Sequence, residues 1–307
     1  MIKSVNPGTK IYGIIGYPLG HSLSPAMHNA AFVAAGIDAV YLTFPMKNVI
    51  NIKYSMRQFS VQGLSVTIPH KINIRRSVDK IDPLALQIGS VNTVLWNKNG
   101  LLEGYNTDGP GAVQAIEESG FSIKGKKVLI IGSGGSARGI AFSLLEKGPS
   151  AIAVLARNAP AVRNLIRGLK LSRSCPELKA FHFPREKEKK IRLQFRYESI
   201  LNDPSQLKEY DLIIQTTPLG MSGHSEQQVT PLSKEYLFSH QVLFDIVYNP
   251  EVTPLVKVAR AKKLKTIPGY KMLLYQGARQ FELFTGKKAP IEVMEKILKG
   301  HLKSSSK

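Results

Sequence analysis

Residues 127–146 place a short apolar run, a glycine-rich turn and a helical pattern in immediate succession, and few folds accommodate that order. The turn consists of Gly132, Ser133, Gly134, Gly135, Ser136 and Ala137. In a dinucleotide-binding fold the first glycine permits a tight turn, the second lets the backbone approach a pyrophosphate, and a small third residue lets the helix pack on the strand. The N–H groups of the helix then face the phosphates. The segment predicts such a fold, and a merely flexible loop is the alternative.

The next apolar run, residues 151–155, bears on the identity of the dinucleotide. It ends at Ala156-Arg157-Asn158, whereas a fold that binds NAD normally carries an acidic residue there for the ribose hydroxyls. The planar guanidinium of Arg157 is suited instead to the additional phosphate of NADP, and Arg163 would assist from the following helix. We therefore expect NADP as the cofactor, with a plain surface arginine as the alternative.

Two series of apolar runs divide the chain. The first comprises residues 11–15, 39–44, 64–68 and 91–95, and the second comprises residues 127–131, 151–155, 212–215 and 242–247. Helical patterns lie between the earlier runs of the first series and alternate with the runs of the second. This alternation predicts an α/β fold whose parallel strands are joined by right-handed crossovers. A chain of 307 residues exceeds the usual size of one core, so we expect two domains. The boundary falls at residues 106–110, where a strand passes into a helix with Thr107 or Asp108 as the N-cap.

The formal net charge of +20 admits acidic small molecules, nucleic acid or an anionic membrane as partners. Many of the basic residues fall in residues 185–196 and 303–307, with few aromatic side chains among them to stack on bases, so nucleic acid is disfavoured. The wider stretch of residues 168–203 is basic and poorly periodic. It predicts an extended loop or a variable addition to the second sheet.

Cysteine content and apolar run lengths indicate the compartment. Cys175 is the single cysteine and cannot form an internal disulfide, and no Cys/His cluster has zinc-ligand spacing. Residues 1–10 lack the apolar core of a signal peptide, and the apolar stretches downstream are interrupted well short of a bilayer span. We expect a cytoplasmic protein with no metal and no membrane segment.

Polar side chains gather just beyond the apolar runs of the first series. Ser22 and Ser24 follow the first run. Residues 66–71 end the third run and place the Thr67 hydroxyl and the Lys71 amine at the carboxyl end of a strand, where ligands of open α/β sheets bind. Some of the candidate residues also have a purely structural interpretation. Ser24, which precedes a proline, could be a helix N-cap. Asn92 and Asp108, in the two segments that follow, could form hydrogen bonds within turns.

These segments, together with residues 245–250 (Asp-Ile-Val-Tyr-Asn-Pro) and 269–276 (Gly-Tyr-Lys-Met-Leu-Leu-Tyr-Gln), closely resemble the shikimate dehydrogenase family in order and over nearly the whole chain. The resemblance implies a substrate domain over residues 1–107, completed by C-terminal helices in residues 270–307. It also implies a Rossmann-like NADP-binding domain over residues 108–269, with an active-site cleft between the domains. The implied activity is the reversible, NADP-dependent reduction of 3-dehydroshikimate to shikimate, a step of chorismate and aromatic amino-acid biosynthesis.

The resemblance also implies roles for individual residues. The substrate carboxylate would meet Ser22 and Ser24, and the ring hydroxyls would meet Thr67, Lys71, Asn92, Asp108, Tyr248 and Gln276. The cofactor would contact Gly132, Ser133, Gly134, Gly135, Ser136, Ala137, Arg157, Ile246 and Gly269, with Met272 near the nicotinamide. The family often shows Asn-Arg-Thr and then a second arginine after the second cofactor strand. This chain has Ala156-Arg157-Asn158 there, with its next arginine at Arg163.

Chemistry assigns two of these residues to catalysis. Reducing a ketone requires a proton donor within hydrogen-bond reach of the developing alkoxide, and Lys71 is the candidate, with Asp108 as the carboxylate that positions it. A relative that acts on quinate as well as shikimate is one alternative. A non-catalytic protein that binds nucleotides or nucleic acid on the same scaffold is the other. We expect a monomer or a homodimer.

Overall fold

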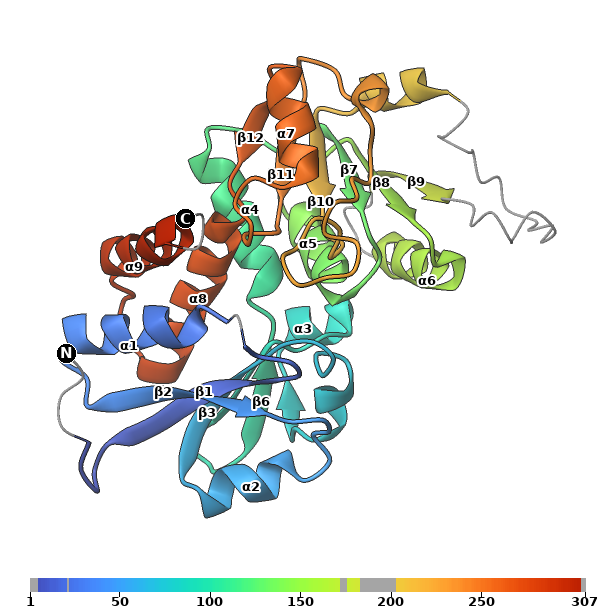
Figure 1. Cartoon of the computed structure of the whole chain (residues 1–307). Coiled ribbons are helices and arrows are strands. Elements are labelled where there is room, and N and C mark those ends of the chain that lie inside the picture. The colour runs from blue at the N-terminus through green and yellow to red at the C-terminus, as the bar shows by residue number, and fades with distance from the viewer. Residues whose placement is uncertain (1–4, 21, 172–175, 183–202, 305–307) are drawn as a thin grey trace. The chain divides into compact units, whose positions relative to one another are not determined.

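The computed structural model describes residues 5–20, 22–171, 176–182 and 203–304, and Figure 1 traces their ribbon. The chain divides into two compact units. The first unit contains Met1–Gly111 and Leu273–Lys307, and the second contains Ala112–Met272. His21, Cys175 and the basic run of residues 185–196 lie outside the described residues.

The first unit is built on a six-stranded mixed sheet with the order β2-β1-β3-β5-β6-β4. Its strands are β1 (Lys10–Gly16), β2 (Ala39–Pro45), β3 (Val61–Val66), β4 (Lys80–Ile81), β5 (Thr93–Trp96) and β6 (Leu102–Tyr105). The pairs β1–β2 and β1–β3 are parallel, as predicted for the series, and so is the pair of β4 and β6, two strands outside it. The same prediction is wrong for β5, which runs antiparallel to β3 and β6.

A tight turn accounts for the antiparallel pairing of β5 with β6. Asn97 accepts hydrogen bonds from the N–H groups of Asn99 and Leu101 through its side-chain oxygen, and Gly100 has a φ of 70°. A connection of this length joins antiparallel neighbours, whereas a parallel pair needs a crossover of about a dozen residues or more. The sequence pattern did not predict β6, because only Leu102 and Gly104 of its four residues face the interior and they make no apolar run.

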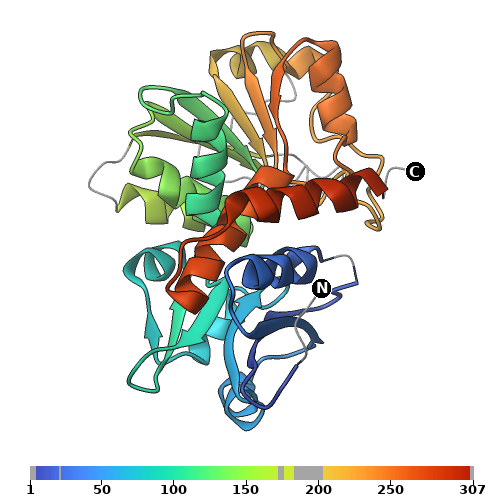
Figure 2. The same ribbon diagram turned by 90° about the vertical axis from the view of Figure 1, so that its left-hand side faces the viewer.

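Helices from both ends of the chain cover this sheet. They are α1 (Ser24–Ala34), α2 (Ile52–Gln58), α3 (Pro83–Ile88), α8 (Tyr270–Thr285, from Leu273 onward) and α9 (Ile291–Ser304), with a 3-10 turn at Asn73–Arg76. Figure 2 shows α1 and α8 on one face of the sheet and the α2 segment on the other. Phe32 of α1 and Phe281 of α8 are fully buried with ring centroids 5.6 Å apart, so the C-terminal helices complete the core of the first unit.

The second unit is built on a six-stranded, all-parallel sheet with the order β12-β11-β10-β7-β8-β9. Its strands are β7 (Lys127–Ile131), β8 (Ala151–Ala156), β9 (Glu177–His182), β10 (Leu212–Gln215), β11 (Val242–Asp245) and β12 (Lys265–Ile267). Strand order reverses at β7, which lies between β8 and β10, and the carboxyl end of such a switch point is where open α/β sheets bind ligands. The described part of residues 168–203 supplies β9, an addition to this sheet.

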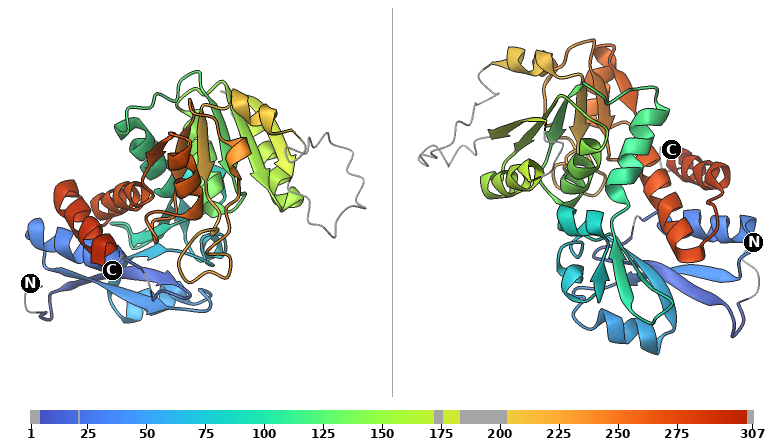
Figure 3. Two further views of the ribbon diagram at one scale, coloured as in Figure 1. Left: turned by 45° about the horizontal axis from the view of Figure 1, so that its top comes forward. Right: turned by 180° about the vertical axis from the view of Figure 1, so that it is seen from behind.

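The helices of the second unit are α4 (Asp108–Glu118, from Ala112 onward), α5 (Gly135–Leu145), α6 (Ala159–Lys170) and α7 (Pro254–Ala261), and Figure 3 shows them from two further directions. Short 3-10 turns lie at Pro204–Glu209 and Lys234–Tyr236. Asn158 caps α6 by accepting from the Ala161 N–H at 3.0 Å, and Thr253 caps α7 by accepting from the Val256 N–H at 3.2 Å. No helix in the described part of the chain has the length and apolarity to cross a bilayer.

Candidate active site

One edge of the first sheet gathers the polar residues that the sequence motifs singled out. Strands β1, β3 and β6 end at this edge, and the antiparallel β5 begins there. The loops after β1 and β3 touch, because the Tyr17 N–H donates to the Ile68 carbonyl oxygen at 3.0 Å. A Cβ at Gly16 would lie 2.4 Å from Thr67 Cγ2, so glycine is required for the loops to meet this closely.

Lys71 and Asp108 form the centre of this edge. The Lys71 Nζ lies 2.5 Å from Asp108 Oδ2, and the two side chains are 16% and 5% exposed. Asp108 is the first residue of α4, where the helix dipole favours a carboxylate. The Asn106 side-chain oxygen accepts from the Asp108 N–H at 3.1 Å, and the Asp108 carboxylate bonds to Lys71 and Asn92.

Asn92 joins this pair to the neighbouring polar side chains. Its Nδ2 donates to Asp108 Oδ1 and to Thr107 Oγ1, both at 2.9 Å, and lies 3.4 Å from Gln276 Oε1. Residues 92 and 108 are 16 positions apart, so the bond is not a local turn contact and the turn alternative for these side chains is wrong. An ammonium, a carboxylate and two amides therefore converge on one spot. Such a set can bind neighbouring hydroxyl groups and give up a proton.

The two serines lie at the start of α1. Ser24 is its first residue, and the N-cap position falls on Leu23 without any side-chain hydrogen bond, so the reading of Ser24 as an N-cap is wrong. The Ser24 N–H faces the Ser22 hydroxyl oxygen at 3.4 Å. Because the Ser24 hydroxyl does not cap this helix, its position is consistent with a ligand contact.

The position of Gln276 depends on a close approach between α8 and the first turn of α4, both of which belong to the first unit there. A Cβ at Gly111 of α4 would lie 2.5 Å from the Gln276 backbone nitrogen and 2.9 Å from its Cα. Glycine therefore lets α4 bring Asp108 beside the turn of α8 that carries Gln276. The Gln276 Nε2 donates to the Leu273 carbonyl oxygen at 3.0 Å, which leaves its oxygen turned to Asn92.

The glycine-rich turn of the second unit has the geometry of a phosphate site. Gly132 has a φ of +117°, and a Cβ there would lie 2.3 Å from Thr216 Oγ1. Gly134 is exposed, caps α5 without a side-chain bond, and would have open space around a Cβ. The first N–H groups of α5 therefore face an open approach, which fits the pyrophosphate of a dinucleotide. The strand, turn and helix follow one another as predicted.

Arg157 leaves the end of β8 with its side chain 51% exposed. Its Nη1 lies 3.5 Å from Oε1 of Glu226, whose side chain is 36% exposed. Glu226 is 69 positions away on the loop after β10, so no local sequence signal could have revealed it. The Arg157 guanidinium is accessible to a phosphate and also forms an ion pair with the Glu226 carboxylate.

Four other predicted residues belong to the second unit. The Ile246 N–H donates to the Gln215 carbonyl oxygen at 3.1 Å, and the N–H of the buried Met272 donates to the Gly269 carbonyl oxygen at 3.1 Å. A Cβ at Gly269 would lie 2.2 Å from the Val247 carbonyl oxygen, so these segments pack backbone against backbone. Tyr248 belongs to this unit as well, unlike the other predicted substrate residues, and burial raises the pKa of its hydroxyl.

Comparisons with known proteins match both ends of the chain. A family model described as the shikimate dehydrogenase substrate binding domain matches residues 14–94, and one described as the shikimate 5'-dehydrogenase C-terminal domain matches residues 269–299. The shikimate dehydrogenase (NADP(+)) of Methanobrevibacter smithii is 39% identical over 297 residues, which cover 96% of this chain and 98% of the relative. The chain belongs to the shikimate dehydrogenase family.

Solved structures of the family have the same fold. A shikimate dehydrogenase in complex with NADP+ matches at a TM-score of 0.83 and 35% identity, over 97% of this chain and 98% of that one. The shikimate 5-dehydrogenase of Thermus thermophilus, in complex with NADP(H) and shikimate, matches at a TM-score of 0.78 and 29% identity. That match covers 95% of this chain and 99% of the other.

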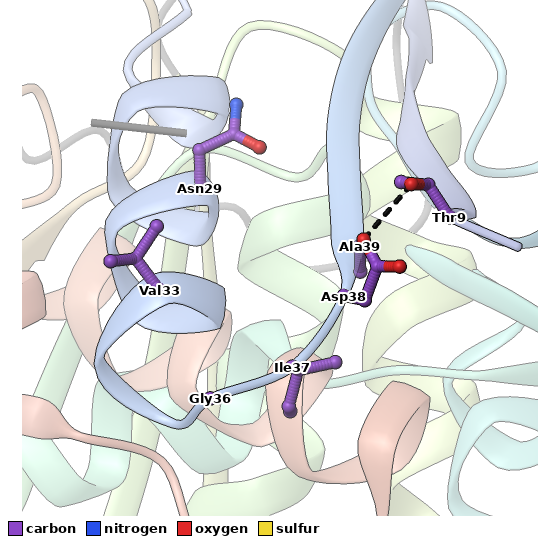
Figure 4. Close-up of a pocket in the computed structure, with 7 residues that line it drawn as sticks. All are labelled: Thr9, Asn29, Val33, Gly36, Ile37, Asp38 and Ala39. Atoms are coloured by element: carbon purple, nitrogen blue, oxygen red, sulfur yellow. Dashed lines mark hydrogen bonds between the residues drawn. The ribbon is translucent and has the colours of Figure 1, made fainter. Parts of the chain in front are cut away.

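A small pocket at the opposite edge of the first sheet contains none of the predicted site residues. It is lined by Thr9, Asn29, Val33, Gly36, Ile37, Asp38 and Ala39 (Figure 4). Thr9 and Asp38 directly precede β1 and β2, so they lie at the amino ends of the strands, and their side chains bond to each other at 2.9 Å. Among the described residues, no three His, Cys, Asp or Glu side chains lie close enough to hold a metal ion.

Proposed function

We propose that this protein is an NADP-dependent shikimate dehydrogenase that reversibly reduces 3-dehydroshikimate to shikimate. The observation that carries the proposal is the buried pair of Lys71 and Asp108, 2.5 Å apart and tied to Asn92 at the ligand-binding edge of the first sheet. The names of the relatives, and the NADP(H) and shikimate bound by the Thermus thermophilus protein, support it.

The substrate would be held by hydrogen bonds from both ends of the site. Ser22 and Ser24 offer hydroxyl donors to the carboxylate. Around the ring, the polar groups are those of Thr67, Lys71, Asn92, Asp108 and Gln276 in the first unit and Tyr248 in the second. A site built to bond hydroxyls discriminates strongly against analogues that leave its buried polar groups unpaired.

Lys71 would act as the proton donor. Bound NADPH supplies the hydride that reduces the carbonyl carbon. As negative charge develops on the carbonyl oxygen, the Lys71 ammonium stabilises it and gives it a proton. Asp108 keeps the ammonium in place, and Asn92 holds the other carboxylate oxygen. In the reverse direction Lys71 takes the proton from the shikimate hydroxyl.

The residues of the second unit fit NADP. The open N-terminus of α5 beside Gly134 would receive the pyrophosphate, and Arg157 would pair with the additional phosphate of the adenosine ribose. Ser133, Gly135, Ser136 and Ala137 continue the turn. Ile246 and Gly269 would also contact the cofactor, and Met272 would lie near the nicotinamide. The proposed enzyme is cytoplasmic and acts as a monomer or a homodimer.

Absorbance of NADPH formed from shikimate and NADP+ tests the proposal. The same assay is run with quinate in place of shikimate and with NAD+ in place of NADP+. We expect fast turnover with shikimate and NADP+, and turnover slower by about tenfold or more with either replacement. Equal rates with quinate would assign a dual-specificity enzyme. Absence of turnover with both acids, together with salt-sensitive binding to duplex DNA, would favour a non-catalytic protein.

A further inference from the structure

A second set of buried polar side chains lies behind the Lys71–Asp108–Asn92 cluster, and the proposed chemistry does not use it. It consists of Tyr41 on β2, Ser65 on β3, Thr93 on β5 and Gln280 on α8. These residues are 1%, 4%, 0% and 2% exposed. Buried polar groups are costly unless they are hydrogen-bonded, so the partners of each group show what the set does.

The four side chains form a continuous line that ends on Asn92. The Tyr41 hydroxyl bonds to Ser65 Oγ at 2.6 Å, and Ser65 Oγ bonds to Gln280 Oε1 at 2.7 Å. The Gln280 Nε2 donates to the Asn92 backbone oxygen at 3.1 Å and to Thr93 Oγ1 at 3.0 Å. The Thr93 hydroxyl in turn donates to Asn92 Oδ1 at 2.8 Å.

The direction of every bond in this line follows from one backbone carbonyl. The Asn92 carbonyl oxygen can only accept, so the nitrogen of the Gln280 amide must face it and the oxygen must face Ser65. Ser65 therefore donates to Gln280, and Tyr41 donates to Ser65. Thr93 has a single proton and already accepts from Gln280, so that proton goes to Asn92 Oδ1.

The same reasoning sets the orientation of the Asn92 side chain. Its Oδ1 accepts from the Thr93 hydroxyl and also from the Thr107 N–H, at 2.8 Å each. Because both bonds require an acceptor, the NH2 group of Asn92 must point the other way, toward Asp108. A flipped amide would place NH2 against two donors and a carbonyl oxygen against the Asp108 carboxylate.

We propose that Gln280 is a positioning residue, which acts through the Asn92 carbonyl and the Thr93 hydroxyl to aim the Asn92 NH2 group at Asp108 and the substrate. The inference rests on the proposed function of Lys71, Asp108 and Asn92. Gln280 does not touch the substrate. Its contribution is to hold the Thr93 hydroxyl, which joins the Thr107 N–H as a second donor to Asn92 Oδ1 and so strengthens the orientation in which the NH2 group faces Asp108.

Three single variants separate positioning from a general contribution to core stability. Both Gln280→Met and Thr93→Val keep the approximate shape of the side chain. Gln280→Met removes the bonds to the Asn92 carbonyl and to the Thr93 hydroxyl, and Thr93→Val removes the hydroxyl that donates to Asn92 Oδ1. Tyr41→Phe is the matched control, because it removes a buried hydroxyl from the same line yet leaves Ser65 free to donate to Gln280. If either Gln280→Met or Thr93→Val does not fold, the remaining variant still tests the connection between Gln280, Thr93 and Asn92.

The first readout is steady-state turnover of shikimate, with thermal unfolding measured on the same samples. We expect kcat/KM for shikimate to fall about tenfold in Gln280→Met and Thr93→Val, with KM for NADP+ unchanged. Tyr41→Phe should stay within about twofold of wild type in kcat/KM even if its Tm falls. The double variant Gln280→Met/Thr93→Val should lose little more than either single variant, because both remove one effect.

The second readout does not depend on turnover. Exchange of the Asn92 side-chain NH2 protons with water, followed by NMR of 15N-labelled protein, should be about tenfold faster in Gln280→Met and Thr93→Val than in wild type or Tyr41→Phe. Unchanged NH2 exchange in folded Gln280→Met would overturn the positioning role, and so would an equal loss of kcat/KM in Tyr41→Phe. An inactive wild-type enzyme with the expected exchange pattern would instead count against the proposed function alone.

Discussion

Lys71 and Asp108 belong to two sequence motifs and lie 37 positions apart in the chain, and the fold brings their charged atoms to 2.5 Å. Their neighbours were less accessible to sequence reasoning. Gln280 reaches Ser65 across 215 positions, and Glu226 reaches Arg157 across 69. A short motif indicates which residue types a site requires at the end of the strand that carries the motif. It holds no signal for a partner supplied by a distant helix or loop.

Replacement of Lys71 tests the proton donor. Lys71→Ala should lower kcat by about two to four orders of magnitude, because the group that stabilises the developing alkoxide is lost, while the dissociation constant of shikimate changes much less. Lys53→Ala is the matched control, since Lys53 is also a lysine of the first unit with a carboxylate partner at 2.5 Å, that of Asp79. Turnover at the wild-type rate in Lys71→Ala would remove Lys71 from the mechanism.

Replacement of Arg157 tests the choice of cofactor. Arg157→Asp should raise KM for NADP+ by about ten- to a hundredfold, because a charge-assisted partner of the phosphate is replaced by a repelling carboxylate. KM for NAD+ should fall or stay constant, since the new carboxylate suits ribose hydroxyls. Arg167→Asp, in the last turn of α6, is the control of equal charge change. An unaltered ratio of the two KM values would mean that another group binds the phosphate.

At the scale of elements, runs of buried aliphatic residues were predictable and short mixed strands were not. Strands β7 and β8 are fully buried from Val128 to Ile131 and from Ala151 to Ala156, so their composition alone identifies them. Strand β9 was missed, because its Glu177 and Lys179 interrupt the apolar pattern on a sheet edge. The antiparallel pairing of β5 with β6 depends on the turn at Asn97, which a pattern of apolar runs does not contain.

Asp245, the last residue of β11, is expected to make the stability of the second unit depend on pH. Asp245 is 1% exposed, and burial raises the pKa of its carboxyl from 3.8 to about 6, although the donors Thr253 and Val247 N–H oppose the change. The folded unit therefore binds more protons than the unfolded chain between these values. We expect the contribution of Asp245 to the free energy of unfolding to be fully present below about pH 4 and to be lost as the pH rises through about 6, a change on the order of 3 kcal/mol.

Amide hydrogen exchange of β10 and β11 at a series of pH values measures this loss. Asp245→Asn should flatten the decline between about pH 4 and pH 7, because the amide has no proton to lose. Glu146→Gln, which changes an exposed carboxylate on the same unit, should leave the decline in place. A decline of wild-type size in Asp245→Asn would assign the pH dependence to another group.

At the scale of the whole molecule, the two units have separate cores and different connections to the chain. The second unit consists of one continuous segment of the chain, and its cluster of buried apolar side chains extends from Leu129 to Leu264. The first unit needs both chain ends, since α9 packs on α1 and buries Met294, Leu298 and Leu302. Two α/β units could be anticipated from the alternation of runs, whereas the return of the C-terminal helices came only from the family resemblance.

Truncation after Gly286 tests this division. Loss of three large buried side chains removes about 1.5–3 kcal/mol each, which approaches the whole stability of a typical domain. We expect shikimate turnover to disappear while NADPH still binds the second unit, as followed by NADPH fluorescence. Removal of residues 305–307 alone is the control and should leave both activities unchanged. Loss of NADPH binding in the longer truncation would show that the second unit depends on the first.

The return of α8 to the first unit has a consequence for biosynthesis. Lys71, Asn92 and Asp108 leave the ribosome early, but Gln276 and Gln280 are translated only after the entire second unit. Until then the polar edge of the first sheet lacks the helix that orders it, and the apolar face beneath α8 is open to water or to a chaperone. The nascent protein can therefore acquire its proposed nucleotide site before its proposed catalytic site, and a chain whose translation ends before residue 273 lacks the latter.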